Sequence, residues 1–242
     1  MKKLFSKNEA LFAVVWIVIY VVGFSNADLI SEKISMEKSI TAGLGLILSA
    51  ILFLFVRNNR LNEYLGLCAF KGDLKKHLYF LPLIVLSLVN VWNGFQMNDD
   101  LLPSVFAVIS MLFVGFLEEV IFRGLLFNAM KKDGLASAVI VSSVTFGIGH
   151  AVNLLLGAPV METILQLIYA TAIGFLFTSL FLSGKSILPL IASHMFINAT
   201  SVFARPIGQT ADILLAAFQT ILAVSYAVWI LKKAYTAPKR EA

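Results

Sequence analysis

Eight long apolar segments, separated by short polar connections, dominate this sequence of 242 residues. Each is close to the roughly 20 residues that a helix needs to cross a bilayer. Backbone groups inside a bilayer must be hydrogen-bonded within the protein, and a helix satisfies them within its own segment. The sequence therefore predicts an all-α, polytopic membrane bundle with about eight transmembrane helices. The segments are 10–24, 39–56, 78–92, 101–130, 135–156, 163–182, 186–203 and 213–231.

Composition supports a single integral-membrane domain over residues 1–242, with the chemically distinctive part at about 101–204. Hydrophobic residues make up 59% of the chain and charged residues only 14%, which excludes an ordinary soluble domain. The only cysteine, Cys68, excludes an internal disulfide. The net charge of +5 could suggest nucleic-acid binding, but in a membrane protein the placement of Lys and Arg over the loops is the informative quantity. We expect the lipid bilayer, and no nucleic acid, as a partner.

The distribution of basic residues predicts the orientation of the chain. With a cytoplasmic N-terminus, eight crossings leave 15 of the 19 Lys and Arg residues on the cytoplasmic side. Only Lys33, Lys38 and Arg205 lie on the other side. The positive-inside rule therefore predicts a multi-pass protein of the plasma membrane with both termini in the cytoplasm. The first apolar segment suits either a signal-peptide core or a spanning helix, and the many later spans favour a retained helix.

Two carboxylates and a guanidinium lie inside the apolar segment 101–130. A charge at the centre of such a helix costs roughly 2.5 to 3.5 kcal/mol on insertion scales, so these residues call for a functional explanation. Glu119 and Arg123 are four residues apart and can face each other on a helix. Glu118 is rotated from Glu119 by about 100° and points elsewhere. We expect one carboxylate to be held by Arg123 and the other, Glu118, to be free to act.

Two further apolar segments carry polar side chains at similar depth. His150 lies in segment 135–156, with Asn153 as a weaker candidate for the same cavity, and His194 and Asn198 lie four residues apart in segment 186–203. A rise of 1.5 Å per residue places Glu118, His150 and His194 about 20, 24 and 14 Å from the cytoplasmic helix ends. A single intramembrane His or Asn often serves only as a hydrogen-bond partner between helices. Together these residues exceed what packing needs, and we expect one functional cavity.

The residue types suit the hydrolysis of a peptide bond in two ways. In the first, Glu118 acts as a general base toward water, a histidine shares that role, and His and Asn donate hydrogen bonds to the oxyanion. In the second, Glu118, His150 and His194 hold a zinc ion with a water as the fourth ligand. The sequence leaves both open, so the expected cofactor is zinc or none.

The motifs resemble those of the CPBP family of intramembrane proteases, also called the CAAX protease and bacteriocin-processing or Abi family. They occur in the family's order on separate apolar segments: Glu118-Glu119-x-x-x-Arg123, Phe146-x-x-x-His150 and His194-x-x-x-Asn198.

The resemblance implies roles for individual residues. It implies a helical bundle whose site opens toward the cytoplasmic side, with Glu118 activating water with the help of His150. His194 and Asn198 would stabilise the oxyanion, and Arg123 would orient the carboxylates. The family has been described both as metal-dependent and as a glutamate-type protease. The compact chain looks more like bacterial members, which are linked to bacteriocin maturation, self-immunity or processing of membrane proteins.

The sequence thus predicts an intramembrane endopeptidase acting on a prepeptide or a membrane-protein substrate. Other protease classes fit less well, because neither HExxH nor GxGD occurs. The competing hypothesis is a non-enzymatic membrane protein. It would be either a bacteriocin immunity factor that acts by binding or a proton-coupled transporter that uses Glu118 and His150 as a relay.

Overall fold

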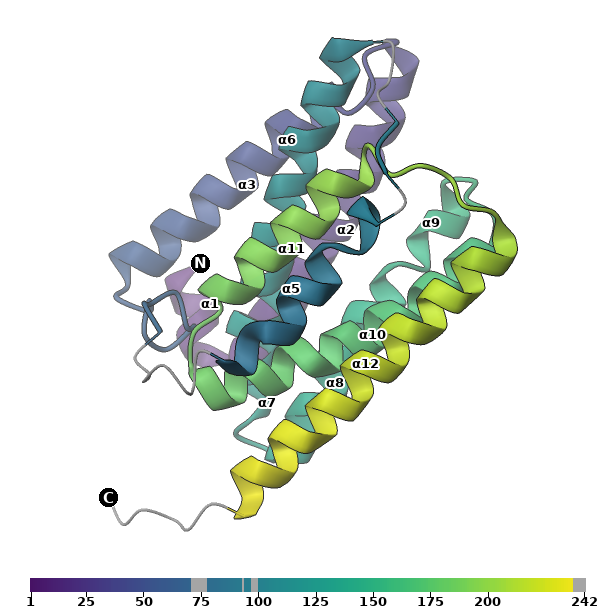
Figure 1. Ribbon diagram of the computed structural model, residues 1–242. Coiled ribbons are helices and arrows are strands. Elements are labelled where there is room, and N and C mark those ends of the chain that lie inside the picture. Colours follow the sequence, from purple (N-terminus) through teal and green to yellow (C-terminus); the bar gives the residue numbers. More distant parts are fainter. Residues whose placement is uncertain (71–77, 93, 97–99, 237–242) are drawn as a thin grey trace.

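The computed structural model describes residues 1–70, 78–92, 94–96 and 100–236, and these residues form a bundle of helices (Figure 1). Within these ranges the only strand-like pairing is an isolated bridge between Phe95 and Ala204. The helices are α1 Lys2–Lys7, α2 Glu9–Lys33, α3 Ser39–Asn58, η1 Leu78–Phe80, α5 Leu81–Ser87, η2 Val89–Val91, α6 Leu101–Glu118, η3 Glu119–Phe127, α7 Asn128–Met130, α8 Leu135–Gly149, α9 Val152–Leu155, α10 Val160–Gly184, α11 Leu188–Ser201 and α12 Gln209–Thr236.

All eight predicted apolar segments are helical, which confirms the all-α polytopic bundle. Six helices or continuous helical stretches are long and apolar enough to cross a membrane. The other two segments are shorter: the described run Leu78–Val91 is broken into η1, α5 and η2, and α11 has 14 residues. Both α5 and α11 have a proline in their first turn, where the missing N–H costs no helical hydrogen bond.

The outer surface of the bundle is apolar. Large aliphatic side chains on four different helices are more than half exposed: Leu46, Ile140, Ile168, Leu214 and Ile221. In water such a surface would be unfavourable, whereas lipid tails solvate it without loss. The surface therefore fits a protein surrounded by lipid.

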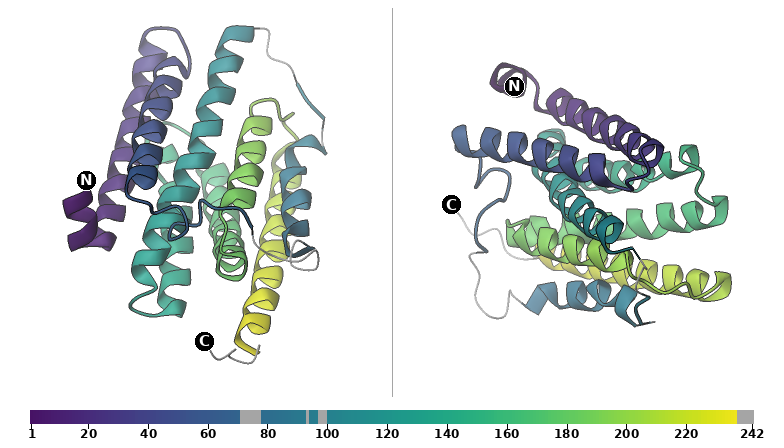
Figure 2. Two further views of the ribbon diagram at one scale, coloured as in Figure 1. Left: turned by 90° about the vertical axis from the view of Figure 1, so that its left-hand side faces the viewer. Right: turned by 90° about the horizontal axis from the view of Figure 1, so that it is seen from above.

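Small residues let the central helices approach closely. Seen from above, α2 and α3 form one side of the bundle and α5 and α12 the opposite side, with α6, α8, α10 and α11 between them (Figure 2). A Cβ on Gly115 of α6 would lie 2.8 Å from the backbone nitrogen of Met195 on α11. A Cβ on Gly147 of α8 would lie 1.9 Å from Thr171 Oγ1 on α10. These glycines set the distances between the helices that carry the polar residues.

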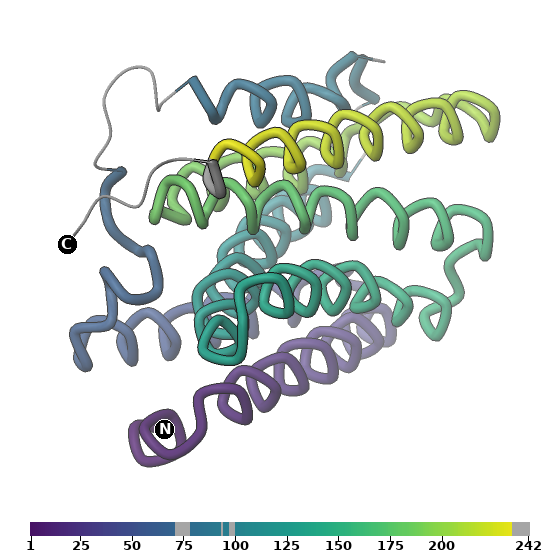
Figure 3. Tube along the Cα trace, turned by 90° about the horizontal axis from the view of Figure 1, so that it is seen from below, coloured from purple at the N-terminus to yellow at the C-terminus, as the bar shows by residue number. Residues whose placement is uncertain are grey.

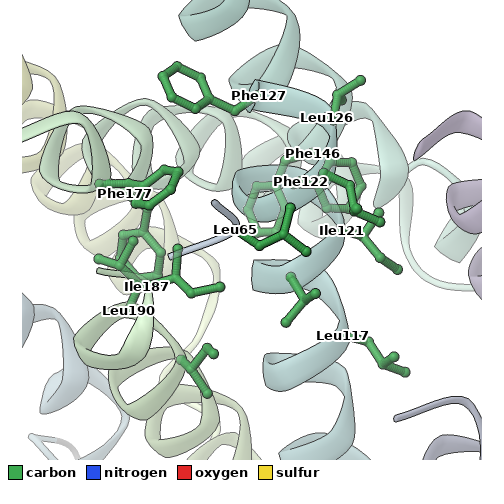
Figure 4. Packing of buried hydrophobic residues seen from close by; sticks show 14 of the residues in the cluster. Leu65, Leu117, Ile121, Phe122, Leu126, Phe127, Phe146, Phe177, Ile187 and Leu190 are labelled. Atoms are coloured by element: carbon green, nitrogen blue, oxygen red, sulfur yellow. The ribbon is translucent and has the colours of Figure 1, made fainter. Parts of the chain in front are cut away.

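The two ends of the bundle differ. We call the end with α1 and the last residues of α12 the termini end, and the end with connections 34–38, 156–159 and 202–208 the cavity end (Figure 3). At the termini end, Leu65 is fully buried and belongs to the apolar core around η3 and α10 (Figure 4). The Ile187 amide donates to Gly66 O at 2.9 Å, and Ser186 Oγ donates to Cys68 O at 2.7 Å. The segment before residue 70 is thereby fixed over this end.

Polar contacts reinforce the termini end. Glu9 accepts hydrogen bonds from Lys132 Nζ at 2.7 Å and from Tyr64 Oη at 2.5 Å. Burial and the contact with Glu9 raise the pKa of the Tyr64 phenol above its ordinary value. Most basic residues that the sequence analysis assigned to the cytoplasm lie at this end, and five of them, at 71, 75, 76, 239 and 240, lie outside the described residues.

Candidate active site

Both carboxylates lie where one long helix changes its geometry. α6 is a regular α-helix to Glu118, and η3, which begins at Glu119, is a π-helix of nine residues. A π-helix has wider turns with i→i+5 hydrogen bonds, is rare, and often marks a functional site. Ser142 Oγ on α8 donates to the Phe122 carbonyl of this stretch at 2.9 Å, which ties η3 to α8.

Glu119 and Arg123 form a fully buried ion pair. Arg123 Nη1 donates to Glu119 Oε1 at 3.1 Å, and both side chains are 0% exposed. The pairing predicted from the four-residue spacing is thus confirmed. The guanidinium carbon also lies 4.1 Å from the centre of the Phe146 ring and 5.4 Å from that of Phe177, within range of cation–π attraction. Figure 4 shows both rings beside the helix that carries the pair.

His194 bridges the two carboxylates. Its Nδ1 is 2.7 Å from Glu119 Oε1, and its Nε2 is 3.4 Å from Glu118 Oε2. Hydrogen bonds from α5 and η2 fix α11 on either side of the histidine: Ser87 Oγ lies 2.7 Å from Ser193 Oγ, and Asn90 Nδ2 donates to Ile197 O at 2.7 Å. The ring is therefore held between the carboxylates by a supported helix.

Tyr20 is a site residue that the sequence analysis missed. Its phenol on α2 donates to Glu118 Oε1 at 2.7 Å, and the side chain is buried. Glu118 is thus held through one oxygen, contrary to the expectation that it stands free. Depth along the helix could have pointed to Tyr20. It lies about 17 Å along α2 from Glu9, close to the roughly 20 Å expected between Glu118 and the cytoplasmic end of its helix. A tyrosine in an apolar helix is too common to attract notice on its own.

The cluster is short of one positive charge. Among the described residues, Glu118 Oε2, Glu119 Oε2 and two nitrogens of Arg123 have no hydrogen-bond partner. Two ionised carboxylates and one guanidinium leave a net charge of −1 in a buried site, which is unfavourable without compensation. His194 Nε2 lies 3.4 Å from Glu118 Oε2, close enough for a proton to pass between the two side chains.

A cavity of about 730 Å³ lies next to this cluster. Glu118, His150, His194 and Asn198 line it, together with Tyr20, while Glu119 and Arg123 are fully buried beside it. The structure therefore brings all six predicted site residues into one region. The weaker candidate, Asn153, also lines the cavity and donates to Gln166 Oε1 at 2.8 Å.

His150 is placed differently from the prediction of a mid-helix histidine. α8 ends at Gly149, and His150 caps it where the chain turns into α9. Its ring meets Phe146 edge to face, with ring centres 5.5 Å apart. The break frees this segment from helical geometry, so that His150 faces the cavity that Glu118 also lines.

The zinc alternative finds no preformed ligand set. Within the described ranges, no three His, Cys, Asp or Glu side chains are placed to hold a metal ion. Glu118 and His194 approach each other, but His150 does not complete a group with them. We therefore assign no step of the chemistry to a metal.

Comparison with known proteins supports the motif-based resemblance. Residues 100–200 match the family model described as type II CAAX prenyl endopeptidase Rce1-like, which confirms the resemblance to CAAX-type membrane proteases. The match covers less than half of the chain and includes all six predicted site residues. No curated protein and no solved structure matches the chain.

Proposed function

We propose that this protein is an intramembrane endopeptidase of the glutamate type, which cleaves a prepeptide or a membrane-protein substrate in the 730 Å³ cavity. The observation that carries the proposal is the state of Glu118. One carboxylate oxygen is held by Tyr20, and the other has no hydrogen-bond partner in the described structure and lies 3.4 Å from His194 Nε2. A fixed carboxylate beside a cavity, with one oxygen that no hydrogen bond occupies, is suited to general-base catalysis. The match of residues 100–200 to a protease family supports the reaction class.

In this mechanism Glu118 Oε2 accepts a proton from water, and the water oxygen attacks the carbonyl carbon of the peptide. His194, oriented by Glu119 through Nδ1, shares that proton through Nε2. As the C–N bond breaks, the proton passes to the leaving amine. One water is consumed, and one carboxyl group and one amine are produced.

The developing oxyanion needs N–H donors, and His150 and Asn198 line the same cavity. The family resemblance implied that His150 assists the base and that His194 stabilises the oxyanion. The contact of His194 with both carboxylates favours exchanging these two roles. A single donor of this kind contributes about 10²- to 10³-fold to the rate. Arg123 and Glu119 act through His194 and are positioning residues.

The test is proteolysis by the purified protein in liposomes on a panel of fluorogenic peptides and candidate prepeptides. We expect Glu118→Gln to lower the cleavage rate by about 10²- to 10⁴-fold, since a general base contributes that much. Glu37→Gln, on an exposed connection, is the matched control and should cleave like the wild type. Thermal unfolding of each variant shows whether the fold persists.

Three outcomes would contradict the proposal. Cleavage that survives in Glu118→Gln removes the proposed base. Cleavage that a zinc chelator abolishes and added zinc restores would replace the metal-free mechanism. If the folded wild type cleaves nothing and Glu118→Gln keeps its cellular phenotype, an immunity factor that acts by binding becomes the better interpretation.

A further inference from the structure

The cavity reaches one end of the bundle. Its lining follows α2 from Tyr20 to Asp28 and α10 from Phe177 back to Glu162, and it includes the first turns of α12 from Asp212. Each of these runs leads from the site to the cavity end, where the helices approach connections 34–38, 156–159 and 202–208. At the termini end Leu65 and its neighbours fill the corresponding space. The mouth of the site therefore lies opposite α1 and the end of α12.

Charge distinguishes the same two ends. Lys33, Lys38 and Arg205 are the basic residues of the described structure at the cavity end. Because basic residues flank spans on the cytoplasmic side, the termini end is assigned to the cytoplasm and the mouth to the opposite face. At the termini end the described structure has ten basic residues: Lys2, Lys3, Lys7, Arg57, Arg60, Lys131, Lys132, Lys185, Lys232 and Lys233.

The mouth is polar, unlike the outer surface. Asp28, held by Lys38 at 2.8 Å and by Thr41, lines it together with Glu162 and Asp212. The Asn153–Gln166 amide pair lies further in. Lipid tails cannot supply the polar partners that carboxylates and amides need, so such a lining does not suit them. A hydrated peptide strand supplies N–H and C=O groups along its whole length.

We propose that the protein takes its substrate from the non-cytoplasmic face, as an extended, water-exposed peptide segment that enters between Asp28, Glu162 and Asp212. This inference rests on the proposed function. Glu118 lies 17 residues, or about 25 Å, along α6 from its first residue at the cavity end. A strand that spans this depth needs about eight extended residues. The substrate is therefore an unfolded tail or loop displayed outside the cytoplasm.

The inference departs from what the family resemblance implied. In this structure the mouth and the termini end lie at opposite ends of the bundle. The site therefore cannot open toward the cytoplasm if both termini are cytoplasmic. The distribution of basic residues favours cytoplasmic termini, so the cytoplasmic opening is the expectation that we abandon.

The experiment uses single cysteines in the Cys68→Ser background, since Cys68 is the only native cysteine. Glu162→Cys places a thiol at the mouth, and Asn58→Cys places one on an exposed position at the termini end. Intact cells are treated with a bulky, membrane-impermeant maleimide. We expect Glu162→Cys to be labelled in intact cells and Asn58→Cys only after permeabilisation. The reverse pattern overturns the assigned orientation.

The same two proteins, purified after labelling, are then assayed on a soluble peptide against mock-treated samples of the same variant. Labelling of Glu162→Cys should lower cleavage at least tenfold by blocking the mouth, whereas labelling of Asn58→Cys should leave it unchanged. Cleavage by labelled Glu162→Cys at the mock rate overturns the entry route even if the orientation is correct. If no mock-treated protein cleaves, the proposed function fails, and the labelling pattern still decides the orientation separately.

Discussion

The two ends of this bundle are built from the same helices but are filled differently. At the termini end, Leu65, Phe181 and Ile187 close the space between the helices with apolar side chains. Toward the cavity end the same helices line a cavity of about 730 Å³ that carries the polar site residues. The boundary is the layer of Glu119, Arg123 and their aromatic neighbours. The comparison indicates that a charged layer can be kept inside a membrane bundle when one side is sealed by apolar packing and the other side borders a cavity.

The largest effect on the free energy of unfolding is expected from Arg123→Ala, which removes the positive charge from this boundary layer. Removing the guanidinium leaves Glu119 buried without its partner, which costs about 3–5 kcal/mol in the free energy of unfolding. Denaturant and thermal unfolding in detergent measure it. Arg205→Ala, in an exposed connection, should change the same quantity by no more than about 0.5 kcal/mol. Equal losses in both variants would mean that the ion pair does not hold the boundary.

Leu65→Ala tests the apolar packing at the termini end. Leu65 is fully buried, so truncation should lower the free energy of unfolding by about 2–5 kcal/mol. Leu155 near the cavity end is 85% exposed, and Leu155→Ala should change stability by about 0.5 kcal/mol or less. The pair is compared in the same detergent and denaturant. Similar costs at the two positions would refute the difference between the ends.

In the cavity, Tyr20→Phe tests how much the hydrogen bond from Tyr20 to Glu118 contributes to catalysis. A hydrogen bond to a charged group contributes about 1.5–3 kcal/mol, so we expect kcat to fall tenfold or more with KM unchanged. Tyr226→Phe, on α12 away from the cavity lining, should behave like the wild type in steady-state kinetics. A rise in KM with constant kcat would instead place Tyr20 in contact with the substrate.

The smallest expected effect is the pH dependence of stability that Tyr64 causes at the termini end. Burial and the bond to Glu9 raise the pKa of Tyr64, so the folded protein keeps this proton at a pH where the unfolded chain, with a pKa of about 10, loses it. The stabilisation is complete below about pH 10 and is lost as the pH rises toward the folded-state value. The difference in melting temperature between wild type and Tyr64→Phe should therefore shrink above about pH 10. A difference that stays constant with pH would contradict the assignment.

Periodicity and depth predicted a large part of the site. The four-residue spacing gave the Glu119–Arg123 pair, because local helix geometry alone brings such residues together. The depth estimate correctly grouped Glu118, His150 and His194 around one cavity. It failed to include Tyr20, since nothing in the sequence tells which face of α2 meets α6.

The sequence by itself determined that the chain is an all-α membrane bundle and which polar residues lie at the depth of the site. Hydropathy and residue spacing are properties of the linear sequence, so they can be read without knowing the fold. Only the tertiary structure decided that His194 bridges both carboxylates, that His150 caps a helix instead of lying within one, and that the cavity opens away from the termini. These features depend on how helices rotate and approach one another, which close contacts such as Gly115 against Met195 fix in three dimensions.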